Sequence, residues 1–284
     1  MLLLFDIGNT HTHVGLANGR RVLRQFNIPT RDWVGGNAAA LVKKFAAGEK
    51  IHGAVLCSVV PRATPLVRKF AAHFGAPGTA LARKAGVQAS ACSGDTLKRE
   101  LQHAETAPGV PLLELTAQTV RGVGIDYPKP DSIGPDRLAN AVAARERFGA
   151  PVVVVDFGTA VTFDVVNSKG DYAGGVIAPG LAAMTDYLHE KTALLPRIQI
   201  REIKNVIGKS TETAMLAGAV HGYRGLVRGL IGELKRELKV KNLPVVATGG
   251  YAKLIAARLP EISAVAPDLT LEGLRLTWLA HGHL

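Results

Sequence analysis

Short apolar runs separated by turn residues set the hydrophobic pattern of this chain. Runs at residues 2–5 and 152–155 each end in Asp-x-Gly, at Asp6 and at Asp156. This pattern is typical of a buried strand that meets a tight turn, with the carboxylate at the junction. The sequence therefore predicts two strands that each carry an acid at the carboxyl end.

The remaining periodicity predicts a mixed α/β chain. Further strands are expected at residues 14–16, 21–27, 53–60 and 244–248, and helices at 37–47, 64–74, 138–148, about 214–238 and 252–258. Residues 83–111 are polar and irregular, which predicts a loop-rich insertion with one short helix around residues 96–103.

The two acidic turns resemble each other. Both read D-x-G-x-x-x-T, from Asp6 to Thr12 and from Asp156 to Thr162, and both precede a second strand and a glycine turn. This recurrence predicts two similar lobes that each present a hairpin turn to a common cleft, although chance recurrence of turn residues is an alternative. Glycine turns and carboxylates together suit a nucleotide triphosphate with its cations.

Two other glycine-containing turns are candidates to contact a nucleotide. Gly208-Lys-Ser-Thr resembles the end of a P-loop, but Ile203 stands where that motif needs a glycine, so a helix start capped by Ser210 or Thr211 is the preferred interpretation. The turn Gly249-Gly250 follows a predicted strand and either borders a nucleoside or merely reverses the chain.

A third acidic segment precedes the helix expected at residues 138–148. Pro135 suits a first helical turn, which places Asp136 and Arg137 among the free N–H groups of the helix start. Asp136 is a candidate to accept a proton from a substrate hydroxyl, and Arg137 is a candidate to bind an anionic group. The alternative is a helix-capping charge with a surface partner.

Composition limits the classes of function. The 284 residues are 47% hydrophobic and 20% charged, which is ordinary for a globular protein. The apolar runs are far shorter than the roughly 20 residues of a membrane span, and Asp6 interrupts any export leader, so a cytoplasmic protein without a membrane helix is expected. Cys57 and Cys92 have no metal-site or redox spacing. The net charge of +11 favours anionic ligands, but scattered basic residues and 5% aromatic residues argue against nucleic acid.

Several blocks in one order resemble the type III pantothenate kinases. They are DIGNTHT, CSVVP, GIDYPKPDSIGPDRLANAVAA, VVDFGTAVTFDVV, YAGGVIAPGL, KTALLP, IGKST and ATGGYA. The resemblance implies an α/β fold of two ribonuclease H-like domains, of the acetate and sugar kinase, heat-shock ATPase and actin type, with an active-site cleft between them. The expected domains are residues 1–119, which include the insertion near 83–111, and residues 120–284.

The resemblance also implies the reaction and its participants. ATP-dependent phosphorylation of pantothenate, the first step of coenzyme A synthesis, would use Asp136 as general base, with magnesium and with potassium or ammonium. The ATP-binding residues would be Asp6, Ile7, Gly8, Asn9, Thr10, His11, Thr12, His13 and Thr159. Asp6 would help to place magnesium, and Asp156 would hold the monovalent cation. Pantothenate would contact Tyr127, Gly134, Pro135, Asp136, Arg137 and Thr192, in a homodimer.

His11 and His13 depart from the family pattern, which has asparagine and an apolar residue there, and solvent-facing strand histidines are the simpler interpretation. Two alternatives to the kinase remain at this point. One is a ribonuclease H-like nucleic-acid enzyme, which would need more clustered carboxylates than the sequence offers. The other is a non-catalytic regulator that keeps the fold and binds nucleotide.

Overall fold

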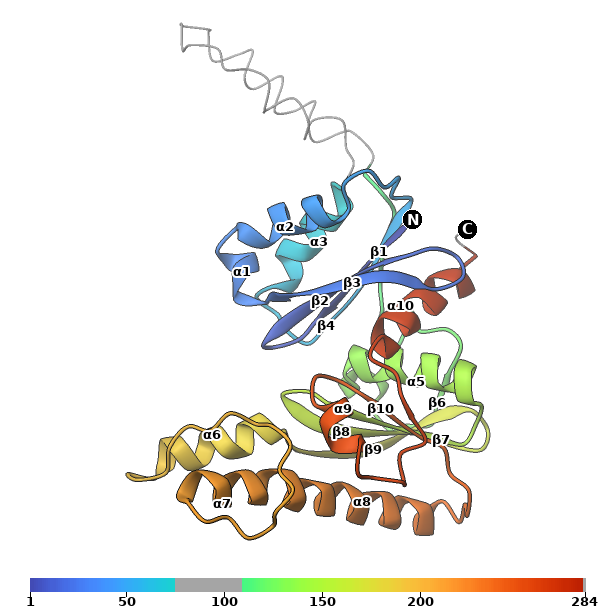
Figure 1. The fold of residues 1–284 in the computed structure, drawn as a ribbon. Helices are drawn as coiled ribbons and strands as arrows, with labels where there is room; N and C mark the ends of the chain where they lie inside the picture. The colour runs from blue at the N-terminus through green and yellow to red at the C-terminus, as the bar shows by residue number, and fades with distance from the viewer. Residues whose placement is uncertain (75–108, 283–284) are drawn as a thin grey trace, which may run out of the picture. The chain divides into compact units, whose positions relative to one another are not determined.

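A computed structural model of the chain describes residues 1–74 and 109–282 (Figure 1). The chain forms two compact units, Met1–Glu114 and Leu115–Leu284. The sequence places this boundary a few residues further along, between residues 119 and 120. Cys92, the helix expected at residues 96–103 and most of the expected insertion lie outside the described residues. Among the described helices, none has the length and apolar character of a membrane span.

The first unit is built on one mixed sheet. Its strands are β1 (Leu2–Ile7), β2 (His11–Ala17), β3 (Val22–Pro29), β4 (Gly53–Ser58) and β5 (Leu112–Glu114). The order across the sheet is β3-β2-β1-β4-β5. β1 to β3 form an antiparallel meander, whereas β4 pairs parallel to β1 and β5 pairs parallel to β4. The meander follows from the expected turn at Asn18, whose side chain accepts backbone N–H groups of Arg20 and Arg21.

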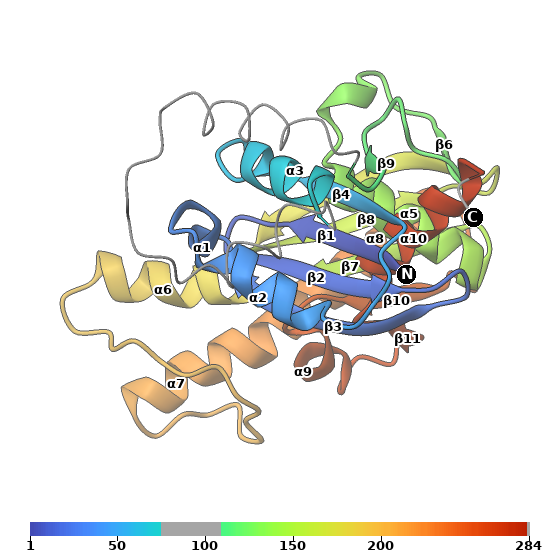
Figure 2. The ribbon, with the colours of Figure 1, turned by 90° about the horizontal axis from the view of Figure 1, so that it is seen from above.

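Helices cover one face of this sheet (Figures 1 and 2). They are α1 (Arg31–Val34), α2 (Asn37–Phe45) and α3 (Thr64–Ala72). The alternation along β1 directs Leu3, Phe5 and Ile7 into the core beneath the helices, where Phe5 meets Trp33 edge to face. Asp6 therefore lies on the opposite face of the sheet from this core.

The second unit repeats the first sheet and extends it. Its strands are β6 (Gly124–Ile125), β7 (Val152–Phe157), β8 (Ala160–Val166), β9 (Asp171–Pro179), β10 (Val245–Thr248) and β11 (Ala264–Val265). The order is β11-β10-β7-β8-β9-β6, so β9-β8-β7-β10-β11 matches the first sheet strand for strand and in direction. Two lobes of one topology, as the recurring acidic turns predicted, are therefore confirmed.

Helices cover both faces of the second sheet. α8 (Tyr223–Glu237), α9 (Ala252–Ala256) and the start of α6 (Leu181–Lys191) pack on the face that carries Val153, Val155 and Phe157. α5 (Pro135–Phe148) crosses the other face, and α10 (Leu269–Ala280) packs along α5. Gly273 permits this close approach, because a Cβ there would lie 1.9 Å from the carbonyl oxygen of Ala139.

The long helix expected at residues 214–238 has two parts. α7 (Thr211–Ala217) leads through a π-helical turn (Gly218–Gly222) into α8. Ser210 caps α7, as one of the two expected residues, since its hydroxyl accepts the Thr213 N–H at 3.2 Å. A short 3₁₀ helix (Pro130–Ser132) precedes α5, which begins at Pro135 as expected.

Candidate active site

Three carboxylates of the second unit lie on α5 or on the sheet face that α5 covers. Asp156 is the last residue but one of β7 and pairs across the hairpin with Thr162 of β8, so the two side chains share a sheet face. Asp164, two residues along β8, lies on the same face. Asp136 lies in the first turn of α5. Asp136 and Asp156 thus belong to the same unit, and the charge of Asp136 acts on Asp156.

Asp136 is held at the start of α5. Its Oδ1 accepts the backbone N–H of Arg137 at 2.9 Å. Burial raises the pKa of Asp136, although the Arg137 N–H and the Arg137 charge oppose this. Gly134 accommodates the carboxylate, because a Cβ at that residue would lie 2.5 Å from Asp136 Oδ1. A carboxyl whose pKa is raised by burial is a stronger base once ionised, which suits Asp136 to accept a proton.

Asp156 is fixed by a relay of two side chains. The Asn140 amide nitrogen donates to Asp156 Oδ2 at 3.1 Å, and the Asn140 amide oxygen accepts the hydroxyl of Thr270 on α10 at 2.8 Å. Burial, followed by repulsion from Asp136, raises the pKa of Asp156 to about 6. A cation beside Asp156 would relieve both the burial cost and the repulsion.

Arg137 is positioned by a buried acid. Its Nε donates to Asp164 Oδ1 at 2.5 Å, and its guanidinium lies 5.7 Å from the ring centre of Tyr172. The hydroxyls of Thr162 and Tyr172 also donate to Asp164, at 3.1 and 3.3 Å. Burial raises the pKa of Asp164 to about 7, and the Arg137 charge opposes that rise. Nη2 of Arg137 is buried and has no hydrogen-bond partner within the described chain, which suits it to an anionic ligand.

Tyr127 and Thr192 lie on different elements of the unit. The Tyr127 ring meets Tyr172 edge to face at 6.1 Å, and Gly174 (φ +109°) leaves room for it. Tyr127 is therefore next to the residue that supports Arg137. The Thr192 hydroxyl, just after α6, donates to the Leu188 carbonyl at 2.8 Å and accepts the Leu195 N–H at 3.3 Å. Thr192 thus shapes an exposed turn.

The turn after β10 packs directly on Asp156. Thr248 pairs with Asp156 in register, and Gly249 follows with φ +89°. A Cβ at Gly249 would lie 2.5 Å from Asp156 Oδ1 and 2.7 Å from the backbone of Phe157. The Gly249-Gly250 turn therefore borders the carboxylate site and does more than reverse the chain.

We expect Gly249→Ala to lower the free energy of unfolding by about 1–3 kcal/mol, because it combines a left-handed backbone with this overlap. Urea denaturation would measure the loss. Gly250→Ala is the matched control, since a Cβ there meets nothing within 4 Å. Equal losses in the two variants would show that the contact with Asp156 is unimportant.

The hairpin of the first unit has a polar tip and an anchored base. Gly8 N–H donates to the His11 carbonyl at 3.0 Å, and Asn9, Thr10 and His11 are exposed at the tip. Asp6 accepts the Cys57 thiol at 3.4 Å. His13 is half-buried next to Asn27, and burial lowers its pKa, so the expected solvent-facing position describes His11 better than His13.

Thr12 belongs to the base of that hairpin. Its hydroxyl is buried, where it contacts the Thr30 hydroxyl at 3.1 Å and accepts the Trp33 Nε1–H at 3.2 Å. The Thr30 hydroxyl in turn donates to the Gly8 carbonyl at 2.7 Å. These bonds brace the glycine turn from within the core, as does the buried Ile7.

The two hairpins differ by one residue in register. Asp6 pairs with His13, whereas Asp156 pairs with Thr162. Thr12 and Thr162, which the sequence motif aligns, therefore lie on opposite faces of their sheets, and Val161 is the structural counterpart of Thr12. Thr159 lies at the exposed tip of the second hairpin, against Gly180, where a Cβ would lie 2.1 Å from the Thr159 carbonyl oxygen.

Comparison with known proteins identifies the family of this chain. The model of the type III pantothenate kinase family matches residues 2–90 and 73–233. A type III pantothenate kinase of Akkermansia muciniphila is 42% identical over 278 residues, which cover 96% of either chain. The chain belongs to the type III pantothenate kinase family. A second member, from Methylacidiphilum infernorum, is 40% identical and covers 97% of this chain and 87% of its own.

Solved structures show the fold of this family member. A protein described as a Baf family transcriptional activator from Campylobacter jejuni superposes with a TM-score of 0.56 at 17% identity, covering 99% of this chain and 100% of its own. A 2-dehydro-3-deoxygalactonokinase protein from Sinorhizobium meliloti gives 0.53 at 15% identity, covering 100% and 98%. At these identities the likeness concerns the fold alone. The expected pair of ribonuclease H-like α/β domains, of the sugar kinase and actin type, is confirmed.

Sequence reasoning missed three side chains of the site. Asp164 follows Thr162 by two residues on one strand, and Asn140 follows Asp136 by four residues on one helix, so periodicity alone could have placed both on the site. Thr270 had no such signal. Within the described residues, no group of three or more histidine, cysteine or acidic side chains is arranged to hold a metal ion.

Proposed function

We propose that this chain phosphorylates pantothenate with ATP as the donor and yields 4'-phosphopantothenate for coenzyme A synthesis. Membership of the type III pantothenate kinase family supports the reaction. The observation that supports its placement is the group formed by Asp136 and Arg137 at the start of α5 and Asp156 on β7, whose pKa the Asp136 charge raises. Phosphoryl transfer needs positioning and charge stabilisation, which this cluster offers.

Asp136 is proposed as the general base. It takes the proton of the pantothenate hydroxyl while that oxygen forms a bond to the γ-phosphorus and the bond to the β-phosphate oxygen breaks, releasing ADP. Arg137 is proposed to bind the pantothenate carboxylate through Nη2, with Asp164 holding the guanidinium in place. Tyr127, Gly134, Pro135 and Thr192 complete the proposed acceptor site.

The hairpin of residues 6–13 is proposed to bind the ATP phosphates, together with Thr159. The exposed tip offers backbone N–H groups and short polar side chains, while the core bonds of Thr12 brace it. Asp6 is proposed to help place magnesium, which neutralises the phosphate charge when bound. Apart from Thr159, this proposal assigns the donor to residues of the first unit and the acceptor to residues of the second.

Asp156 is proposed as the ligand of a monovalent cation, potassium or ammonium. The residues fit such an ion: one buried carboxylate is fixed by Asn140, pushed toward the neutral form by burial, and bordered by the Gly249 backbone. A singly charged ion bound to oxygen ligands tolerates an irregular shell, unlike magnesium. When bound, the ion would lower repulsion around the phosphates.

A homodimer is proposed through the segment that follows β9. Large apolar side chains are exposed on α6 and on the chain after it, including Tyr187 at 61%, Leu194 at 89% and Ile207 at 81%. Such side chains in one segment favour burial against a second copy. A cytoplasmic location, the absence of a nucleic-acid partner and the domain limits 1–119 and 120–284 stay predictions.

The reaction is tested by following ADP release with ATP, magnesium and pantothenate. We expect release that requires pantothenate and rises with potassium, and phosphopantothenate as the product by mass spectrometry. Asp156→Asn should lose the response to potassium while it retains the requirement for pantothenate. ADP release that is indifferent to pantothenate would contradict the proposed function, and a potassium response that persists in the variant would contradict only the cation site.

A further inference from the structure

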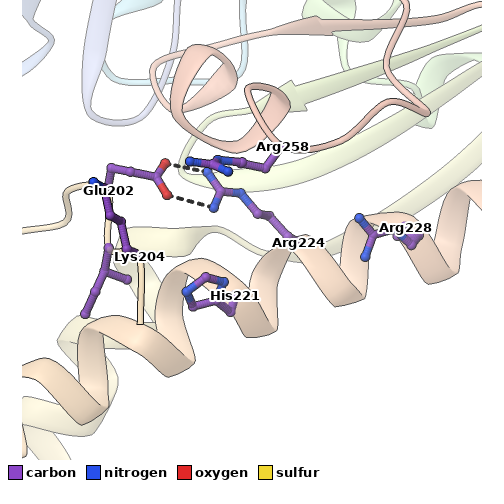
Figure 3. A pocket seen from close by; sticks show the side chains of 7 residues that line it. Glu202, Lys204, His221, Arg224, Arg228 and Arg258 are labelled. Atoms are coloured by element: carbon purple, nitrogen blue, oxygen red, sulfur yellow. Dashed lines mark hydrogen bonds and ion pairs between the residues drawn. The ribbon is translucent and has the colours of Figure 1, made fainter. Parts of the chain in front are cut away.

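A pocket of about 530 Å³ opens on the second unit and shares no lining residue with the carboxylate site (Figure 3). It lies between the chain that leads to α7, the start of α8 and the end of α9. Its ionisable lining consists of Glu202, Lys204, His221, Arg224, Arg228 and Arg258. Four permanent cations thus face one carboxylate, a balance that disfavours a cationic or neutral occupant.

Arg224 and Glu202 form the fixed wall of this pocket. Arg224 is 4% exposed and donates to both oxygens of Glu202, at 3.0 and 2.6 Å. It also donates to the carbonyls of Leu254 and Ile255, at 2.6 and 3.3 Å. The bonds from Arg224 lower the pKa of Glu202 and balance its negative charge. The only acid lining the described pocket is therefore already neutralised.

The other cations are compensated less completely. Arg228 pairs with Glu261 at 2.8 Å, and that pair is partly exposed. Lys204 and Arg258 also line the pocket, and neither has an ion pair within the described chain, although Arg258 lies near Glu202 and helps to lower the pKa of that carboxyl. Nε2 of His221 is buried without a hydrogen-bond partner in the described chain. The pocket thus offers two cations without an ion pair in the described chain and one imidazole nitrogen without a hydrogen-bond partner there.

We propose that this pocket is a second anion site, which binds the phosphate group of a small phosphorylated ligand. Lys204 and Arg258 would pair with the phosphoryl oxygens, and His221 Nε2 would donate to one of them. The volume is in the range of small-ligand sites and leaves room for an organic portion beyond the phosphate. This site shares no residue with the proposed ATP-binding hairpin or with the proposed acceptor site.

The test follows the imidazole NMR signals of the full chain during titration with inorganic pyrophosphate. The His221 signal is the one absent from His221→Asn. We expect this signal to shift saturably, and the double variant Lys204→Gln with Arg258→Gln to need about tenfold more pyrophosphate or more, since each lost charge-assisted bond weakens binding. Because the readout is local to His221, it does not depend on ATP or pantothenate binding elsewhere.

The matched control is the double variant Arg20→Gln with Lys241→Gln, which removes the same charge from exposed positions outside the pocket. It should titrate like the wild type. A His221 signal that ignores pyrophosphate would overturn the proposal, as would equal weakening in both double variants, which would indicate non-specific attraction. Loss of dimer in the pocket variant by analytical ultracentrifugation, without a pyrophosphate effect, would instead assign the pocket to a contact between subunits.

Discussion

Replacing Asp136 with asparagine should lower kcat by about 10²–10⁴-fold, the usual loss for a missing general base. The amide keeps the shape of the side chain at the start of α5 but cannot take a proton. The Gly134 and Arg137 contacts persist, so the fold and the KM for pantothenate should change little. Steady-state kinetics with ATP and pantothenate would measure both constants.

The pH profile separates this role from simple positioning. As pH falls through the raised pKa of Asp136, the base becomes protonated and wild-type kcat/KM should fall. Asp156, with a pKa of about 6, adds a second ionisation to the acidic side of the same pH profile. Asp136→Asn should lose one of the two. The control is Asp32→Asn, which replaces an acid in the first turn of α1 and should keep full activity. A near-normal kcat of Asp136→Asn would contradict the assignment of Asp136 as the general base.

Replacing Asp164 with asparagine should destabilise the second unit by about 3–5 kcal/mol, because it leaves the largely buried Arg137 without its counter-charge. Urea denaturation at pH 8, where Asp164 is ionised in the wild type, would measure this loss. The KM for pantothenate should rise as well, since the guanidinium loses its support. The effect exceeds the range of about 0–1 kcal/mol that is typical of exposed pairs such as Arg236 with Glu233.

A second replacement distinguishes lost pairing from lost packing. Arg137→Met in the Asp164→Asn background removes the stranded charge and should restore part of the stability, although not the activity. Glu233→Gln serves as the surface control and should change the free energy of unfolding by less than about 0.5 kcal/mol. If the double variant is no more stable than Asp164→Asn alone, the ion pair does not determine the loss.

Local patterns in the sequence were sufficient for the hairpins and for the start of α5. Asp6 and Asp156 end buried strands because the apolar run, the acid and the glycine follow in that order. Pro135 fixed the helix start, which put Asp136 and Arg137 in the first turn. Each of these features depends on residues within a few positions of one another.

Features that depend on distant residues were not accessible in this way. α6 and α10 were not predicted, and α10 supplies Thr270 to the relay on Asp156 from a position 114 residues further along the chain than Asp156 itself. The sequence reasoning also missed the π-helical turn between α7 and α8, since the residues on both sides of it are helical and only the hydrogen-bond ladder changes. The burial of the Thr12 side chain was not predicted either, because it follows from strand register, which no motif contains.

The unequal hairpins have a wider consequence. The tip of the first hairpin holds four residues between the last paired positions, Ile7 and Thr12, and the second holds three, between Phe157 and Val161. A single inserted or deleted residue at such a tip exchanges the inward and outward side chains of the returning strand while the scaffold stays the same. Two domains of one topology can in this way present different side chains at equivalent strand positions after a change of a single residue.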